Sequence, residues 1–528
     1  MNSKNRYVFL KSRCGETVPA IITAQGETQP LHSMVDPKRE AERLVCAITE
    51  DIGFIVFFGM GGGFAPAAAL ERTNAHVIVI DFDKDSVNEL FSGIDYSRLV
   101  KNSRFNLLVD LSDEDIKKFI LENYKPALHG GIKTIPLRTR VEHDKKKFEF
   151  AAITLQETIE IISGDYSVQA CFAERWFSNI VRNIKNAEER GLNFQEEIKS
   201  NYVSQTAIAA AGPSLDTQIP SLKEFKSRGG CILSTDTALG ALLQNGITPD
   251  AVVSIDCQHI SYYHFMGNDS GNIPLIMDIA SPPLLAKFSN KPFFFSSGHP
   301  LALYISRYWR PFPLLDTSGG NVTYACLSLA EYLGAKRITL FGADFSYVGS
   351  RSYARGTYIF PYFHKRQNRL SPLEAQFSAF LYRSHFLPSE NNGKKNYYET
   401  TSLRFYRKKL EEKAAAMDAQ IICEPGLGAT ISIEKIPQKS AGTQNNNYKC
   451  ENIKMSGSEF LEQYLKDIAA LPPAEGNDNY LDRLNEKQRQ VFTTLLPLAA
   501  AVKKRNTSLK QNDLIEEIKR LSALRAAF

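Results

Sequence analysis

The sequence lacks paired cysteines, a long apolar run and a strong excess of charge, and each absence argues against a class of protein. None of the eight cysteines forms a Cys-x-x-Cys pair, and no histidine cluster accompanies them, so we expect neither a zinc site nor a disulfide framework. No stretch of about 18 apolar residues is present to span a membrane. No apolar core follows Met1–Arg6, so we expect no signal peptide and a cytoplasmic protein. The net charge of +5 over 528 residues does not indicate a nucleic-acid-binding protein.

The length is sufficient for two to four domains, and the composition of 43% hydrophobic and 23% charged residues is that of a globular protein. Two helices are expected around the connection between the first two of these domains, at 145–164 and 167–191. The expected divisions are an N-terminal domain at 1–150, a helical connector at 151–201, a central domain at 202–435, a polar linker at 436–455 and an all-helical C-terminal domain at 456–528.

A glycine-rich turn follows the first buried strand of the N-terminal domain. Phe54–Phe58 leads into Gly59, Gly61 and Gly63, and a second apolar strand ends at Asp81, about 20 residues further on. This unit resembles the first half of a Rossmann fold and predicts a second nucleotide or adenosyl-methionine site, with Asp81 on a ribose. The alternative is a Rossmann-like domain that holds no ligand.

Asp81-Phe82-Asp83 also spells the Asp-x-Asp of metal-dependent glycosyltransferases. Its position directly after a strand explains Asp81 without a metal, so we expect no metal site.

The central domain opens on an apolar run, Ala207–Ala211, that is typical of a strand buried on both faces. Gly212 and Pro213 end this strand. Ser214 and Asp216 are placed to cap a following helix, which we expect over 221–226. Such a turn leaves N–H groups free to hold a phosphate or a carboxylate.

Short strands and helices alternate through the rest of this domain, which predicts a parallel sheet covered by helices on both faces. One short strand is expected at Leu314–Leu315. Ligands bind such sheets outside the carboxyl ends of the strands, and those ends carry Ser214, Asp236, Asp256, Ser297, Ser318 and Asp344.

An aromatic and basic segment follows at 345–398. It is either a lid or binding loop over the ligand site, or a solvated insertion.

Five blocks of the central domain resemble the motility accessory factor family, which shares this domain with archaeal-type 6-hydroxymethylpterin diphosphokinases. The blocks are Ala211–Leu215, Thr235–Ala238, Asn245–Asp250 with Val252–Asp256, Ser318–Val322 and Phe341–Tyr347. The resemblance implies a glycosyltransferase that moves a nonulosonic acid, of the pseudaminic, legionaminic or sialic type, from its CMP-activated form to Ser or Thr of flagellin. It also implies a central fold like the family-42 sialyltransferases, and a reaction that needs no metal or other cofactor.

The donor site expected on this basis lies at the strand ends. It comprises Gly212, Pro213, Ser214, Leu215, Thr235, Asp236, Thr237, Asp256, Ser297, Gly298, Ser318, Gly319, Gly320, Asn321, Asp344 and Tyr347. Transfer also needs a base to take the proton of the acceptor hydroxyl. The candidates are Asp256, His259 and His299, with His264 as a further histidine, and each histidine has a plain surface or core role as its alternative.

Two other functions stay open. A pterin diphosphokinase would use ATP and Mg²⁺, with Asp236, Asp256 and Asp344 around the metal-bridged phosphates, although the chain has no Gly-x-x-x-x-Gly-Lys-Ser/Thr loop. A non-enzymatic flagellin-binding factor would use the C-terminal helices and the aromatic segment. Docking of a partner and simple packing against the core are equally open for those helices.

Overall fold

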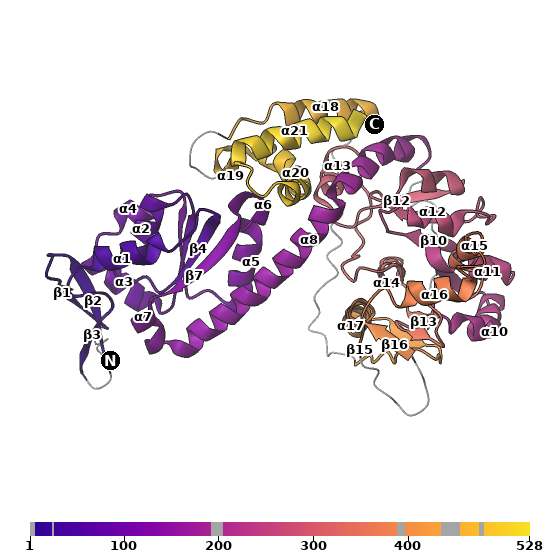
Figure 1. Ribbon diagram of the computed structural model, residues 1–528, viewed down its shortest axis with the longest axis horizontal. Coiled ribbons are helices and arrows are strands. Elements are labelled where there is room, and N and C mark those ends of the chain that lie inside the picture. The colour runs from indigo at the N-terminus through magenta and orange to yellow at the C-terminus, as the bar shows by residue number, and fades with distance from the viewer. Residues whose placement is uncertain are drawn as a thin grey trace. The chain divides into compact units, whose positions relative to one another are not determined.

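The computed structural model describes residues 6–23, 26–191, 204–387, 397–434, 455–474 and 480–527, and the chain forms two compact units (Figure 1). Unit 1 comprises Met1–Ala173 and Asp467–Ser522, and unit 2 comprises Glu174–Lys466 and Ala523–Phe528. The end of the expected connector, 192–201, and the expected linker except Met455 lie outside the described residues.

Unit 1 contains a four-stranded parallel sheet in the order β6-β5-β4-β7. The predicted strand, glycine turn, helix and strand are confirmed as β4, α2 and β5. Because β7 pairs with β4 on the side away from β5, the chain order of the sheet reverses between β4 and β7. A small antiparallel sheet, β1-β2-β3, precedes it. The strands are β1 (Tyr7–Lys11), β2 (Thr17–Ile22), β3 (Thr28–Pro30), β4 (Ile52–Phe58), β5 (His76–Asp81), β6 (Phe105–Val109) and β7 (Gly131–Pro136).

Short helices connect these strands and cover the parallel sheet. They are α1 (Pro37–Cys46), α2 (Phe64–Arg72), α3 (Lys84–Gly93), α4 (Ser97–Val100), α5 (Asp113–Asn123), α6 (Pro126–His129) and α7 (Arg138–His143). The two faces of the sheet have separate cores, one around Ile55 and Val79 and the other around Phe54 and Ile80.

A single helix, α8 (Lys145–Glu189), replaces the two helices expected at 145–164 and 167–191. Gly164 lies inside it, and no atom lies within 4 Å of the place where its Cβ would be. A glycine inside a helix costs about 1 kcal/mol relative to alanine, which a helix of 45 residues tolerates. Gly164 therefore does not divide the helix.

Unit 2 is built on the predicted parallel sheet, with seven strands in the order β12-β11-β10-β9-β8-β13-β17. β8 is buried on both faces, as predicted, because Ile208 packs in the core under α14 and α17 while Ala207 and Ala209 pack under α10 and α11. The strands are β8 (Gln205–Ala209), β9 (Cys231–Thr235), β10 (Ala251–Ser254), β11 (Leu275–Asp278), β12 (Pro292–Phe295), β13 (Arg337–Phe341) and β17 (Gln420–Cys423).

The helices around this sheet differ from the expectation in two places. They are α10 (Leu215–Ser227), η2 (Asp236–Ala238), α11 (Leu239–Gln244), α12 (Ile260–Phe265), η3 (Pro283–Phe288), α13 (Pro300–Tyr308), α14 (Val322–Tyr332) and α17 (Thr401–Ala416). α10 begins at Leu215 rather than Ser221, because Pro220 lies within its second turn and removes only one helical hydrogen bond. The strand expected at Leu314–Leu315 is wrong: Leu314 makes one isolated bridge to Ser296.

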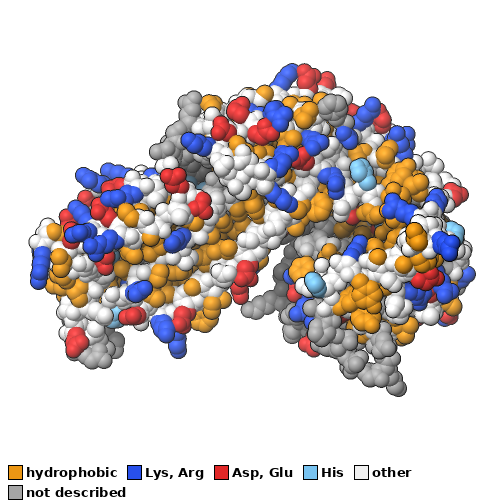
Figure 2. All heavy atoms as spheres, viewed as in Figure 1, with side chains coloured by type: hydrophobic (Ala, Val, Ile, Leu, Met, Phe, Trp, Pro, Cys, Tyr) orange, Lys and Arg blue, Asp and Glu red, His pale blue; other side chains and the backbone are white. Residues whose placement is uncertain are grey.

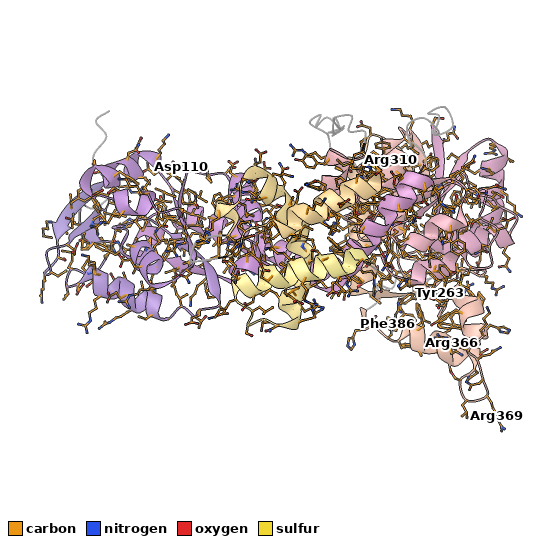
Figure 3. The ribbon with its side chains drawn as sticks, turned by 90° about the horizontal axis from the view of Figure 1, so that it is seen from above. Asp110, Tyr263, Arg310, Arg366, Arg369 and Phe386 are labelled. Carbon is orange, nitrogen blue, oxygen red and sulfur yellow. The ribbon has the colours of Figure 1, made fainter. Side chains whose placement is uncertain are left out.

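The aromatic segment at 345–398 contains β14 (Tyr347–Val348), α15 (Ile359–His364), α16 (Leu373–Leu381), β15 (Phe386–Leu387) and the start of β16 (Tyr397–Thr400). Its helices pack through rings: the centroid of Phe363 lies 5.0 Å from that of Phe377 and 5.9 Å from that of Phe380. Figure 3 shows Arg369 at the tip of the α15–α16 lobe and Tyr263 at its base. Tyr398 in β16 and Phe405 in α17 are 40% and 49% exposed. Figure 2 shows hydrophobic side chains at the surface in the region of these two elements.

The C-terminal region is helical, as predicted, with α18 (Gly457–Ala469), α19 (Tyr480–Arg483), α20 (Glu486–Arg505) and α21 (Gln511–Ala527). Apolar residues of α20 from Val491 to Val502 are buried, and α20 packs against α6. In the described part of the chain, no helix combines the length and the apolar character that crossing a bilayer requires.

Candidate active site at the strand ends of the central sheet

The turns after β8 and β13 interlock at the carboxyl edge of the seven-stranded sheet. The N–H of Gly212 donates to the carbonyl of Gly342 over 2.8 Å. A Cβ at Gly212 would lie 2.4 Å from that same carbonyl oxygen, and Gly342 itself has a φ of +62°. Both positions therefore require glycine, for backbone packing at Gly212 and for conformation at Gly342.

The Gly-Pro-Ser turn has no spare N–H groups for a ligand. Gly212 donates to Gly342, Ser214 to Asp344, Leu215 to Gly212, and Asp216 to Pro213. Pro213 has no N–H. The expectation that this turn presents free N–H groups is therefore wrong.

Asp344 stabilises the Gly-Pro-Ser turn through hydrogen bonds to Ser214. Its carboxylate accepts from the Ser214 N–H over 2.7 Å and from the Ser214 hydroxyl over 2.5 Å. That hydroxyl also accepts from the N–H of Leu427 over 2.7 Å. Ser214 is fully buried and Asp344 is 4% exposed. Ser214 makes no side-chain helix cap, contrary to the expectation, because its hydroxyl points to Asp344.

Asp236 follows β9 and is also held inside the protein. Its carboxylate accepts from the Thr237 N–H over 2.7 Å and from the Ser254 hydroxyl over 2.8 Å. The Thr237 hydroxyl lies 3.5 Å from Nε2 of His264. Thr235, also in the expected site, is a buried strand residue that donates to the carbonyl of Ala209.

Asp256 follows β10 and is half-buried, with Gln258 of its own loop as its hydrogen-bond donor. Burial raises the pKa of the Asp256 carboxyl; the Gln258 N–H opposes the shift and the charge of Asp236 adds to it. Burial likewise raises the pKa of Tyr406, on α17, and the charge of Asp256 adds to the shift. Asp256 is therefore within electrostatic range of Asp236 and of Tyr406.

The turn before α14 supplies N–H groups that the Gly-Pro-Ser turn does not. A Cβ at Gly320 would lie 3.0 Å from Cε1 of Tyr406, so this turn adjoins the surroundings of Asp256. Asn321 caps α14 by accepting from the Tyr324 N–H over 3.0 Å. Within the described residues, no acceptor satisfies the N–H groups of Gly319, Asn321, Val322 and Thr323. Those free donors at the start of an 11-residue helix suit an anion.

Asp316 organises this turn through two hydrogen bonds. Its carboxylate accepts from the Ser318 N–H over 2.9 Å and from the Tyr324 hydroxyl over 2.5 Å. The Ser318 side chain is exposed, 3.4 Å from the Tyr324 hydroxyl.

The aromatic segment covers the strand ends, which supports the lid interpretation over a solvated insertion. The Ala354 N–H donates to the carbonyl of Ala211 over 2.8 Å. Arg351 pairs with Asp216 over 2.5 Å, so Asp216 serves the covering segment rather than a helix cap. The ring of Tyr358 packs edge-on against His264 with centroids 4.5 Å apart.

His264 is the histidine that the structure places beside the carboxylates. Burial lowers its pKa, while the charges of Asp236 and Asp256 oppose the shift. Its Nδ1 is buried without a hydrogen-bond partner among the described residues. His259 begins α12 as an exposed residue, on the same loop as Asp256 but outside this packing.

The other end of the sheet is closed by α8. Amides of Asn179, Asn183 and Asn186 donate to backbone carbonyls of the loops after β10 and β11. His299, after β12, packs against Trp176 of α8 with centroids 5.6 Å apart and caps α13 through Nδ1. Burial lowers the pKa of His299 to about 4, so its ring is neutral at pH 7.

The predicted residues thus fall into three groups. One group comprises the partly exposed Asp256, Gly320 and Asn321 with the buried Gly319, and Ser318 is exposed beside them. An internal group supports the turns: Gly212, Pro213, Ser214, Leu215, Thr235, Asp236, Thr237 and Asp344. The third comprises Ser297, Gly298 and His299 on the β12 side, and Tyr347 in β14, whose ring packs on Phe386.

Sequence reasoning missed Tyr358 and Tyr406. The aromatic richness of 345–398 pointed to Tyr358 as part of a covering segment, but no pattern distinguished it from its neighbours. Tyr406 lies in an ordinary helical stretch, and only the packing of α17 brings it to Gly320.

The glycine turn of unit 1 is filled by side chains of the chain itself. Nε2 of His32 accepts from the Gly62 N–H over 2.7 Å, and a Cβ at Gly61 would lie 2.5 Å from that nitrogen. Gly59, Gly61 and Gly63 all have positive φ, so the backbone conformation accounts for glycine here.

Asp81 is fully buried and its carboxylate is occupied inside the protein. It accepts from the N–H groups of Met60 and Phe82, each over 2.7 Å, and pairs with the fully buried Arg140 over 2.7 Å. This arrangement favours the alternative in which the Gly59–Asp81 unit holds no ribose. Over the described residues, no group of three or more His, Cys, Asp or Glu side chains is arranged to hold a metal ion.

Comparisons with known proteins agree with this architecture. Residues 178–350 match the model of the MptE-like family, described as 6-hydroxymethylpterin diphosphokinase MptE-like. The chain is 27% identical over 192 residues to the 6-hydroxymethyl-7,8-dihydropterin pyrophosphokinase of Pyrococcus furiosus, covering 34% of this chain and 71% of that protein. It is 38% identical over 125 residues to an uncharacterized protein of Treponema pallidum, covering 23% of this chain and 44% of that protein. The chain thus spans less than half the length of this last relative.

The fold extends this likeness to the whole chain. The structure of MAf glycosyltransferase from Magnetospirillum magneticum AMB-1 matches with a TM-score of 0.57 and 14% identity, over 100% of this chain and 91% of that one. The resemblance that the five sequence blocks predicted is therefore confirmed: the chain has the MAf glycosyltransferase fold around an MptE-like region.

Proposed function

We propose that the protein is a cytoplasmic glycosyltransferase that moves a nonulosonic acid from a CMP-sugar to Ser or Thr of flagellin. The observation that carries this proposal is the fold similarity to MAf glycosyltransferase over 100% of the chain. The pterin kinase relative matches only 34% of the chain, within the central region. The match to the glycosyltransferase therefore accounts for both units of the chain, whereas the match to the kinase accounts for the central region alone.

The donor is proposed to lie at the turn before α14. A CMP-nonulosonic acid carries a phosphate and a carboxylate, and the free N–H groups of the partly exposed Asn321 and Val322 are suited to one of these anions. Hydrogen bonds from such donors stabilise the charge that grows on the phosphate as it leaves. Tyr406 adjoins this turn at Gly320, and we propose that its ring helps to exclude water from the donor.

Asp256 is proposed as the base. In the transfer, the acceptor hydroxyl gives its proton to Asp256, its oxygen forms the new bond to the anomeric carbon, and CMP leaves with the electron pair of the broken C–O bond. The raised pKa of Asp256, caused by burial and by Asp236, makes its carboxylate a better proton acceptor. His259 and His299 do not share the packing around this carboxylate.

The test is CMP release and intact mass of purified flagellin after incubation with CMP-pseudaminic, CMP-legionaminic or CMP-sialic acid. Asp256→Asn should lower the rate by about 10²- to 10⁴-fold, the usual contribution of a general base. His259→Gln, an exposed histidine on the same loop, is the matched control and should keep its rate. Full activity of Asp256→Asn, with loss in His264→Gln, would contradict the assignment of the base. No transfer from any of the three donors would contradict the function.

A pterin diphosphokinase is the second candidate, because the MptE-like match and the P. furiosus relative both lie in the central region. Asp256 is then the carboxylate open to a Mg²⁺-bound phosphate, since Asp236 and Asp344 are occupied by Ser254, Thr237 and Ser214. Mass spectrometry after incubation with ATP, Mg²⁺ and 6-hydroxymethyldihydropterin separates the two, because only the kinase forms a diphosphorylated pterin.

A further inference from the structure

A large cavity lies within unit 1 at the carboxyl ends of β4 and β7, and the first residues of the Gly59–Asp81 unit form part of its wall. Its volume is about 780 Å³, within the range of small-molecule sites. Gly59 and Met60 line it after β4, and Leu137 and Arg138 line it after β7. Residues of α1 complete the wall. The cavity is therefore formed by two strands of the sheet, β4 and β7, with the turns that follow them, and by the helix α1 that packs beside them.

The position of the cavity agrees with the topology of the sheet. β5 and β6 extend from β4 in one direction, and β7 pairs with β4 on the other side. The carboxyl ends of β4 and β7 therefore flank the point where the strand order reverses, and open parallel sheets bind ligands in the crevice at that point. The cavity occupies this crevice, whereas the space beside Asp81 is filled by Arg140.

Three arginines line the cavity and are exposed: Arg39 and Arg43, one turn apart on α1, and Arg138 after β7. Among the described residues, none of their guanidinium groups has a hydrogen-bond or carboxylate partner. Two acids also line the cavity, and both make local bonds: Asp36 accepts from the Arg39 N–H over 2.9 Å, and Glu40 accepts from the Ser33 N–H over 2.9 Å. Unpaired guanidinium groups in one hollow favour a phosphate or a carboxylate.

The walls between these arginines are apolar. Phe57, Pro66 and Ile135 line the cavity, and Val35 and Leu44 are 57% and 47% exposed at its surface. Exposed apolar side chains beside unpaired cations suit a ligand with a flat apolar part and an anionic part. His32 adds no charge, because burial lowers its pKa to about 4.

We propose that this crevice between β4, β7 and α1 binds a nucleoside phosphate, with the phosphate on Arg39, Arg43 and Arg138 and the base against Val35 and Leu44. This site belongs to unit 1, whereas the proposed donor site belongs to unit 2. It includes Gly59 and Met60 of the Gly59–Asp81 unit, but it does not use Asp81. It does not depend on the reaction that unit 2 catalyses.

The test measures how fast each arginine of the crevice is chemically modified. The full chain is treated with phenylglyoxal, with and without each common nucleoside mono- or diphosphate, and the modified arginines are quantified by peptide mass spectrometry. A nucleotide at about ten times its Kd should slow modification of Arg39, Arg43 and Arg138 by about tenfold, as mass action requires for a blocked site. Arg98, an exposed arginine of unit 1 outside the cavity, is the internal control and should react at an unchanged rate.

Two variants and one further probe complete the test. Arg138→Gln should weaken the protection of Arg39 and Arg43 at least severalfold, whereas Arg98→Gln should not. Pyrophosphate alone should protect less than the matching nucleotide, because it lacks the base. Equal protection by pyrophosphate, protection that includes Arg98, or no protection by any nucleotide would each overturn the proposal. Because the readout is local, these outcomes are independent of whether unit 2 transfers a sugar.

Discussion

The pair Ser214–Asp344 gives the sharpest test of whether polar strand ends bind a ligand or support the turns. Asp344→Ala removes the acceptor of the Ser214 N–H and of the Ser214 hydroxyl, bonds of 2.7 Å and 2.5 Å. Both donors are buried, so water cannot replace the lost acceptor. A buried polar group left without a partner costs about 1–3 kcal/mol. We therefore expect unit 2 to lose about 2–5 kcal/mol of its free energy of unfolding.

Ser214→Ala should cost less than Asp344→Ala. It leaves the Ser214 N–H bonded to Asp344 but removes the hydroxyl and, with it, the acceptor of the Leu427 N–H. The expected loss is about 1–3 kcal/mol. The loss of stability in the double variant should be smaller than the sum of the two single losses by about 0.5–3 kcal/mol, because both single variants remove the same hydrogen bond.

Tryptophan fluorescence measures this effect in unit 2 alone. The sequence has two tryptophans, Trp176 and Trp309, and both lie in unit 2. With a urea m-value of about 3 kcal/mol/M, a loss of about 3 kcal/mol lowers the unfolding midpoint by about 1 M. Asp269→Ala, at an exposed aspartate of the same unit, is the matched control and should change the free energy by less than about 0.5 kcal/mol.

One result would refute the reasoning. If Asp344→Ala keeps the urea midpoint of the unaltered chain but no longer binds CMP in calorimetry, Asp344 contacts the ligand and does not support the turn. The hydrogen bonds of the turn would then contribute little to stability, and the original expectation for Asp344 as a donor-site residue would stand.

Two further predictions concern buried charges. Burial raises the pKa of Asp278 to about 6 despite bonds from Ala280 and Ser297. The folded state therefore holds the proton more tightly, and stability should fall as the pH rises from about 4 to about 6, by about 3 kcal/mol at most. Asp278→Asn should flatten that dependence in tryptophan-monitored unfolding, and parallel pH curves would contradict it. In unit 1, Arg140→Met leaves Asp81 buried without its 2.7 Å ion pair and should cost about 3–5 kcal/mol, read by faster hydrogen exchange in β4 and β5. Unchanged exchange rates would show that Asp81 does not need this partner.

Local sequence patterns were sufficient to predict the sheet of unit 2. Ala207–Ala211 predicted β8 because small apolar residues without alternation fit a strand covered on both faces. The same logic failed at Leu314–Leu315, where two apolar residues are too few to distinguish a strand from a buried loop. It also failed at Gly164, because a single glycine costs only about 1 kcal/mol and does not by itself end a long helix.

The roles of the polar residues could not be predicted in this way, because their partners are distant in the sequence. Ser214 is bonded to Asp344, 130 residues away, and to Leu427, 213 residues away. No spacing rule near Ser214 signals either bond. His264 and His259 illustrate the same difficulty on one short helix: His259 is nearer to Asp256 in the sequence, but only His264 turns inward against Tyr358.

Polarity at a strand end therefore does not identify a site; polar groups that the fold leaves unused do. In unit 2 the buried polar side chains of Ser214, Asp236 and Asp344 are bonded to neighbouring side chains and backbone groups. The N–H groups of Asn321 and Val322 at the start of α14, in contrast, have no acceptor among the described residues. In unit 1 the Asp81 carboxylate is paired with Arg140, whereas the guanidinium groups that line the β4–β7 crevice have no carboxylate or hydrogen-bond partner among the described residues. A bound anion would supply the missing partner in both places. An anion makes charge-assisted hydrogen bonds with such donors, and a concave, partly apolar surface adds contacts with the rest of the ligand, so these two positions are where we expect a ligand to bind.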